Sequence, residues 1–222
     1  MIVPTGAGDG SGAPPSGDGT PAGGLSPAAL ARAVEVLGQG LPIALPTDTV
    51  YGLAVDPFLP GASDRVFEMK RRPRHECLPV LVASTEQALD LATAVPDSAR
   101  VLMARFWPGA LTVVLPARPG LGADLGDDDA TIGVRCPDHP VPLALCRAVG
   151  PLATTSANVH RQPTLTTAVE VAEAFADALP VVLDGGTCTG SPSTVVDCTG
   201  FEPRLLREGR VPWSAVLEAL GG

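Results

Sequence analysis

The stretch "LPTDTVYGLAVDP", residues 45–57, carries the polar triplet Thr47-Asp48-Thr49 between two apolar runs. The run that leads into it, "PIALP" at 42–46, is short and apolar, which is typical of a buried strand. We therefore expect a strand that ends on two hydroxyls and a carboxylate. Such groups serve either a ligand or, in the case of an aspartate, the backbone of the turn itself.

Segments after and before this stretch show alternating helical and strand patterns. Apolar residues at helical spacing, stopped by Gly or Pro, predict helices at 26–38, 62–70, 85–95, 97–106, 141–149, 166–175 and 213–220. Short apolar runs predict strands at 78–83, 110–117, 131–136, 151–158, 180–186, 193–199 and 203–209. Strands interleaved with helices, some close enough in sequence to pair antiparallel, predict an α/β protein with a mixed sheet. The acidic segment "GADLGDDDA" at 122–130 is expected to be a solvated loop.

Composition limits the possible classes of protein. A chain of 222 residues with 45% hydrophobic residues can bury one sizeable core, and we expect a single domain over residues 25–222. Residues 1–24 are rich in Gly and Pro and almost free of large apolar side chains, so we expect a disordered tail there. No stretch is apolar enough for a membrane span, and no signal peptide is evident, so we expect a cytoplasmic protein.

Charge and cysteine usage exclude further functions. The formal net charge of −9 disfavours broad electrostatic binding of nucleic acid, so any anion must be met by a local basic cluster. The five cysteines lie far apart without a C-x-x-C pair, which indicates neither a zinc site nor a disulfide framework. No metal site is predicted. P-loop, metalloprotease and serine-hydrolase motifs are also missing, so the remaining chemistry is substrate positioning by hydroxyls and arginines.

Two segments are candidates for such a site. The run "KRRPR" places four of the 15 Lys and Arg residues within positions 70–74, at the end of a predicted helix. It is either an anion site or a solvated helix end whose cations suit the helix dipole. The segment "TTSANVHRQPT" at 154–164 follows a predicted strand. It either presents hydroxyls and N–H groups to a phosphate or forms an ordinary turn with a helix cap.

Other candidates lie at later strand ends. Arg135 ends an apolar strand, where a guanidinium requires a carboxylate or phosphate partner. His139 is expected to be a hydrogen-bonded structural residue of the following turn. Ser193 and Arg207 flank two adjacent strands, and the alternative for them is cross-strand pairing with surface acids such as Glu202.

Seven segments together resemble the YrdC-like threonylcarbamoyl-AMP synthase family, in the order of that family and from about residue 41 to 210. They are "PTDTVYGLA", "KRRP", "WPGALTVVLP", "TIGVRCPDHP", "TTSAN", "STVVD" and "LLREG". The resemblance implies a single domain in its short form, with a twisted mixed parallel and antiparallel sheet, flanking helices and a concave cleft. It also implies an enzyme, an ATP-dependent nucleotidyltransferase that makes L-threonylcarbamoyladenylate from L-threonine, bicarbonate or CO2, and ATP, with release of pyrophosphate. The product is the donor for the threonylcarbamoyl group on adenosine 37 of tRNA.

The resemblance further implies residue roles, matched motif by motif. Catalytic roles fall to Lys70 and Arg72, with Mg²⁺ accompanying the nucleotide. Contacts to L-threonine fall to Thr49, Arg135, Thr154 and Ser193. Because a methyl group alone distinguishes threonine from serine only weakly, we also expect Tyr51 and neighbouring apolar groups to shape a methyl pocket. Contacts to ATP fall to Arg72, Thr131, Ser156, Asn158, Thr164 and Arg207. The downstream tRNA threonylcarbamoyltransferase is an expected partner, whereas direct tRNA binding is disfavoured by the acidic composition.

Two departures from the family pattern leave alternatives open. Glu76 stands where the family commonly has Asn, and His160 with Arg161 alters the "SANxSG" pattern. One alternative is therefore a paralogue that adenylates another carbamoyl acceptor. A separate alternative, which rests on the basic cleft and is disfavoured by the acidic composition, is a YrdC-like module that binds double-stranded RNA or tRNA without turnover.

Overall fold

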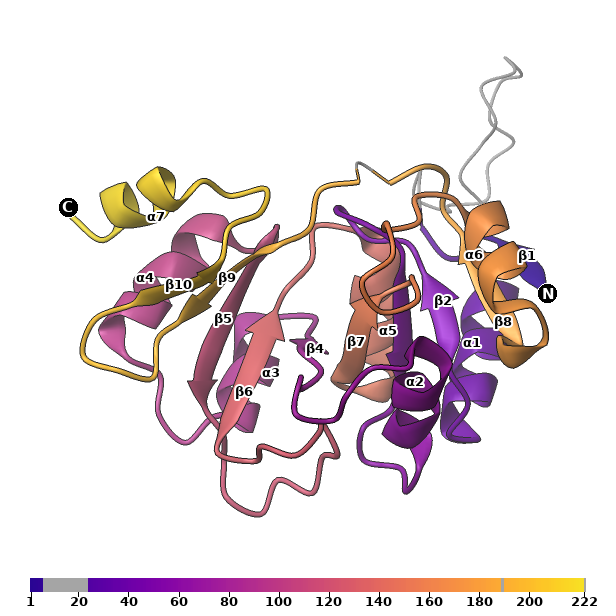
Figure 1. Cartoon of the computed structure of the whole chain (residues 1–222), viewed down its shortest axis with the longest axis horizontal. Coiled ribbons are helices and arrows are strands. Elements are labelled where there is room, and N and C mark those ends of the chain that lie inside the picture. Colours follow the sequence, from indigo (N-terminus) through magenta and orange to yellow (C-terminus); the bar gives the residue numbers. More distant parts are fainter. Residues whose placement is uncertain (6–23, 189, 222) are drawn as a thin grey trace.

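The computed structural model describes residues 1–5, 24–188 and 190–221, which form helices packed on both faces of one sheet (Figure 1). The strands are β1 (Ile2–Pro4), β2 (Ile43–Leu45), β3 (Gly52–Val55), β4 (Val80–Leu81), β5 (Leu111–Pro116), β6 (Thr131–Arg135), β7 (Leu152–Ser156), β8 (Val181–Asp184), β9 (Thr194–Asp197) and β10 (Arg204–Arg207). The helices are α1 (Pro27–Gly38), α2 (Ala62–Lys70), α3 (Thr85–Leu91), α4 (Asp97–Phe106), α5 (Pro140–Val149), α6 (Ala168–Phe175), the short 3-10 helix η1 (Ala176–Ala178) and α7 (Trp213–Ala219). The prediction of an α/β fold with a mixed sheet is confirmed.

The sheet has the order β1-β8-β2-β3-β7-β4-β6-β5-β9-β10. Parallel pairs are β1 with β8, β2 with β8, β4 with β6 and β5 with β9, and the other neighbours are antiparallel. The register sets Gly52 opposite Ser156 and Leu111 beside Thr194. The start of β3 therefore meets the end of β7, and the starts of β5 and β9 lie side by side. These strand ends carry the candidate residues.

Successive side chains of the central strands pack into two separate hydrophobic cores, one on each face of the sheet. In β2, Ile43 and Leu45 pack with α1 and α5, whereas Ala44 between them packs into the core that includes α2 and α4. This follows from the period of two in a strand, which sends successive side chains to opposite faces. A sheet that is apolar on both faces needs helices on both, and Figure 1 shows α1 and α2 on opposite sides of it.

Three features differ from the sequence-based expectation. Strand β3 was not predicted, although all of its residues are buried. At the start of the expected tail, Ile2–Pro4 form β1 and pair with β8, so the tail prediction does not hold for these residues. Residues 6–23 of the expected tail lie outside the described part of the chain.

In the described part, no helix combines the length and apolar character that crossing a bilayer requires.

The acidic segment at 122–130 is the third difference, because it is docked against the protein and is not simply solvated. Arg74 forms ion pairs with Asp64 of α2 and with Asp124 and Asp127 of the segment, at 2.5, 2.5 and 3.6 Å. Gly126 approaches the backbone of Arg74 so closely that a Cβ atom at this position would lie 2.4 Å from the carbonyl oxygen of Arg74. The prediction failed because composition shows the charge of a loop but not the partner of that charge.

Candidate active site

A cavity of about 270 Å³ lies where the strand ends of β3, β7, β5, β6, β9 and β10 come together. Its lining residues are Thr47, Thr49, Val50, Tyr51, Gly52, Arg72, Pro79, Leu81, Thr112, Arg135, Thr154, Thr155, Ser156, Thr164, Pro192, Ser193 and Arg207. The site residues predicted from the sequence are therefore brought together here, except Lys70, Asn158 and Thr131. The cavity is lined mainly by hydroxyls, three guanidinium groups and small apolar side chains.

The polar triplet forms one wall, and its shape is set by Thr47. The Thr47 hydroxyl accepts hydrogen bonds from the backbone N–H groups of Thr49 and Val50 at 3.1 and 3.2 Å, and it donates to the carbonyl of Val50 at 2.7 Å. The Thr47 and Thr49 hydroxyl oxygens are 2.8 Å apart. A side chain that replaces backbone partners in this way fixes a tight turn, so the Thr49 hydroxyl is held in one place.

Tyr51 follows the triplet closely in the sequence, is fully buried, and bonds the segment that follows β8. Its hydroxyl donates to the carbonyl of Gly186 at 2.8 Å and accepts from the N–H of Gly185 at 3.2 Å. Burial raises the pKa of this phenol, so it stays neutral. Tyr51 is one of the residues that line the cavity, and its hydroxyl has its hydrogen-bond partners in Gly185 and Gly186.

Arg135 and Asp48 form a buried ion pair beside the triplet. Arg135 Nη2 lies 2.6 Å from Asp48 Oδ1, and the side chains are only 8% and 10% exposed. Arg135 also donates through Nη1 to the Thr49 hydroxyl at 3.0 Å and through Nε to the carbonyl of Gly109 at 2.9 Å. Burial lowers the pKa of Arg135, and the carboxylate of Asp48 opposes that effect. Asp48 is therefore paired with the guanidinium that lines the cavity.

Two further arginines line the cavity: Arg72, which follows α2, and Arg207. Arg207, at the end of β10, donates to the carbonyl of Ser193 from Nε and Nη2 at 3.1 and 2.9 Å, and to the Ser193 hydroxyl at 3.2 Å. Burial lowers its pKa, as do the charges of Arg135 and Arg72. Three cations thus share a partly desolvated cavity, an arrangement that favours an anionic ligand.

The Ser193 and Thr112 hydroxyls lie 3.0 Å apart on neighbouring strands. Thr112 and Thr155 are lining residues that the sequence analysis missed. Thr112 lies inside an apolar strand, and only the pairing of β5 with β9 brings it beside Ser193. Thr155 stands between the predicted Thr154 and Ser156 in the sequence and was passed over. Pro79, Leu81 and Pro192 were missed because nothing in their sequence neighbourhoods marks them as lining residues.

Lys70 is not among the residues that line the cavity, and it is 1% exposed. Its ammonium donates to the carbonyls of Ser156 and Asn158 at 2.5 Å each and to Asn158 Oδ1 at 3.0 Å. Asn158 Oδ1 also accepts from the Ser156 hydroxyl at 2.6 Å. Lys70 and Asn158 thus shape the turn that presents Ser156. Burial, with the charge of Arg72, lowers the pKa of Lys70 to about 7.

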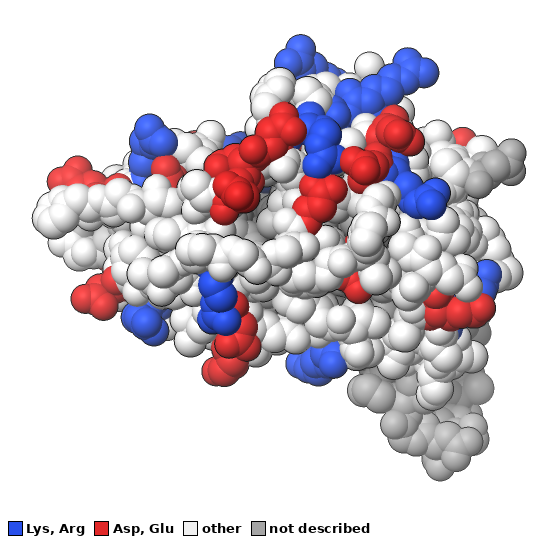
Figure 2. Space-filling view, turned by 90° about the horizontal axis from the view of Figure 1, so that it is seen from below, with Lys and Arg blue, Asp and Glu red and all other residues white. Residues whose placement is uncertain are grey.

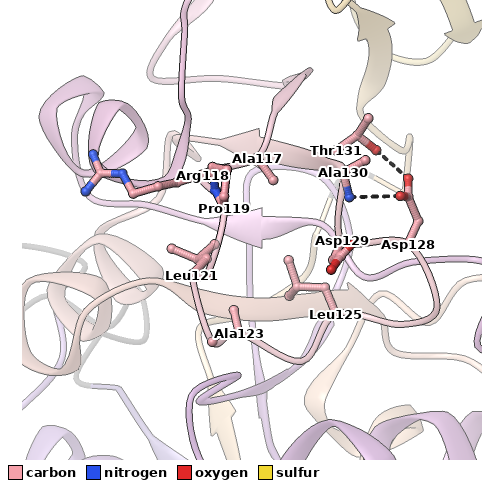
Figure 3. A pocket seen from close by; sticks show the side chains of 12 residues that line it. Ala117, Arg118, Pro119, Leu121, Ala123, Leu125, Asp128, Asp129, Ala130 and Thr131 are labelled. Carbon is pink, nitrogen blue, oxygen red and sulfur yellow. Dashed lines mark hydrogen bonds between the residues drawn. The ribbon is translucent and has the colours of Figure 1, made fainter.

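Thr131 lies in a different place from the other predicted residues. It lines a second hollow of about 500 Å³, enclosed by residues 117–131. Its hydroxyl donates to Asp128 Oδ2 at 2.8 Å, and Asp128 Oδ1 accepts from the N–H of Ala130 at 2.9 Å (Figure 3). Figure 3 also shows the Arg118 side chain pointing away from this hollow. The structure therefore separates Thr131 from the cavity that the other candidates share.

Comparison with known proteins identifies the family. Residues 35–209 match the family model Sua5/YciO/YrdC, described as "Telomere recombination". The chain belongs to the Sua5/YciO/YrdC family. This confirms the resemblance inferred from the seven motifs, and the matched range contains every residue that lines the cavity.

Similar proteins of this family include curated enzymes and solved structures. The threonylcarbamoyl-AMP synthase of Bacillus subtilis is 38% identical over 195 residues, covering 86% of this chain and 56% of that protein. The threonylcarbamoyl-AMP synthase of Klebsiella pneumoniae is 39% identical over 185 residues, covering 82% of this chain and 96% of that protein. The crystal structure of Pyrococcus abyssi Sua5 complexed with L-threonine matches with a TM-score of 0.81 and 36% identity, over 89% of this chain and 58% of that one. This Sua5/YciO/YrdC chain thus spans just over half the length of some relatives and nearly all of others.

Proposed function

We propose that the protein is a threonylcarbamoyl-AMP synthase that makes L-threonylcarbamoyladenylate from L-threonine, bicarbonate or CO2, and ATP, with release of pyrophosphate. The observation that carries this proposal is the hydroxyl-lined cavity that receives Arg72, Arg135 and Arg207 from three separate elements. Substrates with a carboxylate and a triphosphate need several fixed cations. Family membership, with relatives named for this activity, supports the same conclusion.

The two substrates would divide the cavity. Arg135, held by Asp48 and beside the Thr49 hydroxyl, is suited to the threonine carboxylate. Thr154 and Ser193 add hydroxyls to this half, and Tyr51 supplies the apolar surface for the methyl group. A methyl group alone distinguishes threonine from serine by only about 1–3 kcal/mol, so the fit of this apolar wall governs selectivity.

Arg72 and Arg207 would meet the phosphates, together with the hydroxyls of Ser156 and Thr164 in the cavity lining. Lys70 contributes from behind the wall by fixing the turn of Ser156. Mg²⁺ is expected to arrive with the nucleotide. Thr131 has no part in this arrangement unless the nucleotide extends into the second hollow.

The reaction needs positioned charges and no covalent attachment to the protein. The amine of threonine captures CO2 as a carbamate, and a carbamate oxygen attacks the α-phosphorus as pyrophosphate leaves. Negative charge builds on the phosphates in the transition state, where fixed guanidinium groups stabilise it. Loss of one such donor typically costs about 3 kcal/mol, or on the order of a hundredfold in rate. The product would pass to a downstream tRNA threonylcarbamoyltransferase in the cytoplasm.

Threonine-dependent release of pyrophosphate from MgATP and bicarbonate tests this proposal. Arg72→Ala should reduce the rate at least a hundredfold, whereas Arg204→Ala, which removes a guanidinium that is 74% exposed, should leave it unchanged. Absence of threonine-dependent release by the unaltered protein would refute the proposal. A screen of other amino acids identifies a paralogue, and salt-dependent RNA retention without turnover identifies an RNA-binding module.

A further inference from the structure

A carboxylate lies against the guanidinium that is proposed to meet the nucleotide phosphates. Arg72 donates through Nε to the carbonyl of Glu76 at 2.7 Å and through Nη2 to the carbonyl of Cys77 at 3.2 Å. These bonds fix the plane of the guanidinium. The remaining nitrogen, Nη1, lies 3.5 Å from Glu76 Oε2. The Nη1 atom, which is the nitrogen of Arg72 best placed to bind a phosphate, therefore has the Glu76 carboxylate beside it.

His160 lies on the other side of the same carboxylate. Its Nε2 atom is 3.6 Å from Glu76 Oε1, and its backbone N–H donates to the carbonyl of Lys70 at 3.0 Å. The three side chains are partly buried, with exposed fractions of 18% for Arg72, 33% for Glu76 and 20% for His160. The carboxylate is thus between two donors, at a distance from each that is longer than a good hydrogen bond.

We propose that Glu76 and His160 set the affinity of this site for the nucleotide: Glu76 competes with a phosphate for Arg72, and His160 competes with Arg72 for Glu76. This inference rests on the proposed function. A phosphate that approaches Arg72 Nη1 meets the negative charge of Glu76 at short range in a partly desolvated site. Repulsion there is poorly screened. Movement of the carboxylate toward His160 would relieve it, because His160 can donate from Nε2 and needs no backbone change to do so.

Three variants separate these contributions through a binding measurement, with threonine absent so that no turnover occurs. Glu76→Gln keeps the shape of the side chain and removes its charge. His160→Phe keeps the ring and removes its donor. The double variant completes a cycle that isolates the coupling between the two residues. Glu218→Gln removes the same charge from an exposed position on α7, which lies at the far end of the molecule from α2 (Figure 1).

Titration of MgATP by calorimetry should show about tenfold tighter binding for Glu76→Gln than for the unaltered protein. His160→Phe should bind about threefold more weakly when Glu76 is present and should have no effect in the Glu76→Gln background. Glu218→Gln should bind as the unaltered protein does. Glu76→Asn, a shorter neutral side chain, provides the same comparison if the thermal midpoint of Glu76→Gln shows that it folds poorly.

The proposal is overturned if Glu76→Gln binds MgATP no more tightly than the unaltered protein, or if His160→Phe weakens binding equally in both backgrounds. It is also overturned if Glu218→Gln tightens binding as much as Glu76→Gln, because the effect would then come from net charge alone. In each of these cases the unaltered protein still binds ATP and releases pyrophosphate with threonine. Failure of the proposed function instead removes threonine-dependent release of pyrophosphate from the unaltered protein.

Discussion

The Asp48 and Arg135 pair gives the sharpest test of how the site is held together. Asp48→Asn keeps the size of the side chain and one acceptor oxygen but leaves the charge of Arg135 without its carboxylate. The two groups are 2.6 Å apart and at most 10% exposed. Removing one partner of a buried pair costs about 3–5 kcal/mol, and losing a hydrogen bond to a charged group costs about 1.5–3 kcal/mol. Because the amide still accepts one bond, we expect the free energy of unfolding to fall by about 2–4 kcal/mol.

A matched control is available on the surface. Glu35 pairs with Arg32 at a similar distance of 2.7 Å, but the side chains are 58% and 39% exposed. Exposed pairs contribute at most about 0.5 kcal/mol when they lie one helical turn apart. Glu35→Gln therefore makes the same chemical change, carboxylate to amide, without the burial. Denaturant unfolding of both variants gives the comparison, provided that the dependence of unfolding free energy on denaturant is unchanged.

A second measurement distinguishes a role in the site from a role in stability alone. Arg135 bonds the Thr49 hydroxyl, so loss of Asp48 should raise the KM for threonine more than the dissociation constant for MgATP. Asp48→Glu, which restores the charge, should recover part of the threonine affinity. If Asp48→Asn destabilises the protein no more than Glu35→Gln, the account of this buried pair is wrong. Equal effects on threonine and ATP would refute the positioning role.

Two further predictions concern the wall of the cavity. Gly209→Ala should cost on the order of 2–4 kcal/mol of stability and weaken threonine binding, because the new Cβ atom would lie 2.3 Å from the Pro192 carbonyl oxygen and 2.5 Å from the Ser193 carbonyl carbon. The control is Gly38→Ala, whose new Cβ atom would have no atom within 4 Å and which should be neutral or stabilise the protein by up to about 1 kcal/mol. Equal unfolding midpoints for the two variants would contradict this prediction. Burial in the folded protein lowers the pKa of Lys70 from 10.5 to about 7, so between these pH values the unfolded chain binds more protons than the folded one. The free energy of unfolding should therefore rise with pH across this range, by at most about 1.4 kcal/mol per pH unit. Lys70→Met should lack this contribution, and parallel pH profiles of stability for the two proteins would contradict the prediction.

Much of the fold could be predicted because most elements carry their own local signals. The helix α1 begins at a Ser-Pro cap and ends at glycine, and the predicted and observed bounds agree closely. Strand β3 carried no such signal. It begins with Gly52, directly after the polar triplet, and all its residues are buried, so no alternation of polar and apolar side chains marks it. Strand β1 pairs with β8 far away in sequence, and local composition says nothing about that contact.

The site was predicted as far as strand ends could be placed. Thr49, Arg135, Ser193 and Arg207 converge because the register brings their strand ends together. Lys70 shows where a motif misleads. It was assigned with its basic neighbours, yet it stands four residues after the buried Val66 and so continues the inner face of α2. Helical spacing, applied to this lysine, would have placed it inside the protein and behind the cavity wall.

The charge distribution explains how an acidic chain can hold a site for anions. The net charge of −9 repels an extended polyanion, and in the face shown in Figure 2 basic side chains lie among acidic ones and form no separate field. At the cavity the balance is reversed, because Arg72, Arg135 and Arg207 all line it and Asp48, the acid beside Arg135, is held in an ion pair with that guanidinium. Salt screens exposed charges beyond about 10 Å but screens the buried Arg135 far less, so a small anion that enters is attracted by the arginines that line the cavity, with Glu76 opposing this only at Arg72. A duplex RNA spanning the surface would meet the acidic exterior instead. The same charges therefore favour a nucleotide and an amino acid over a nucleic acid at this site.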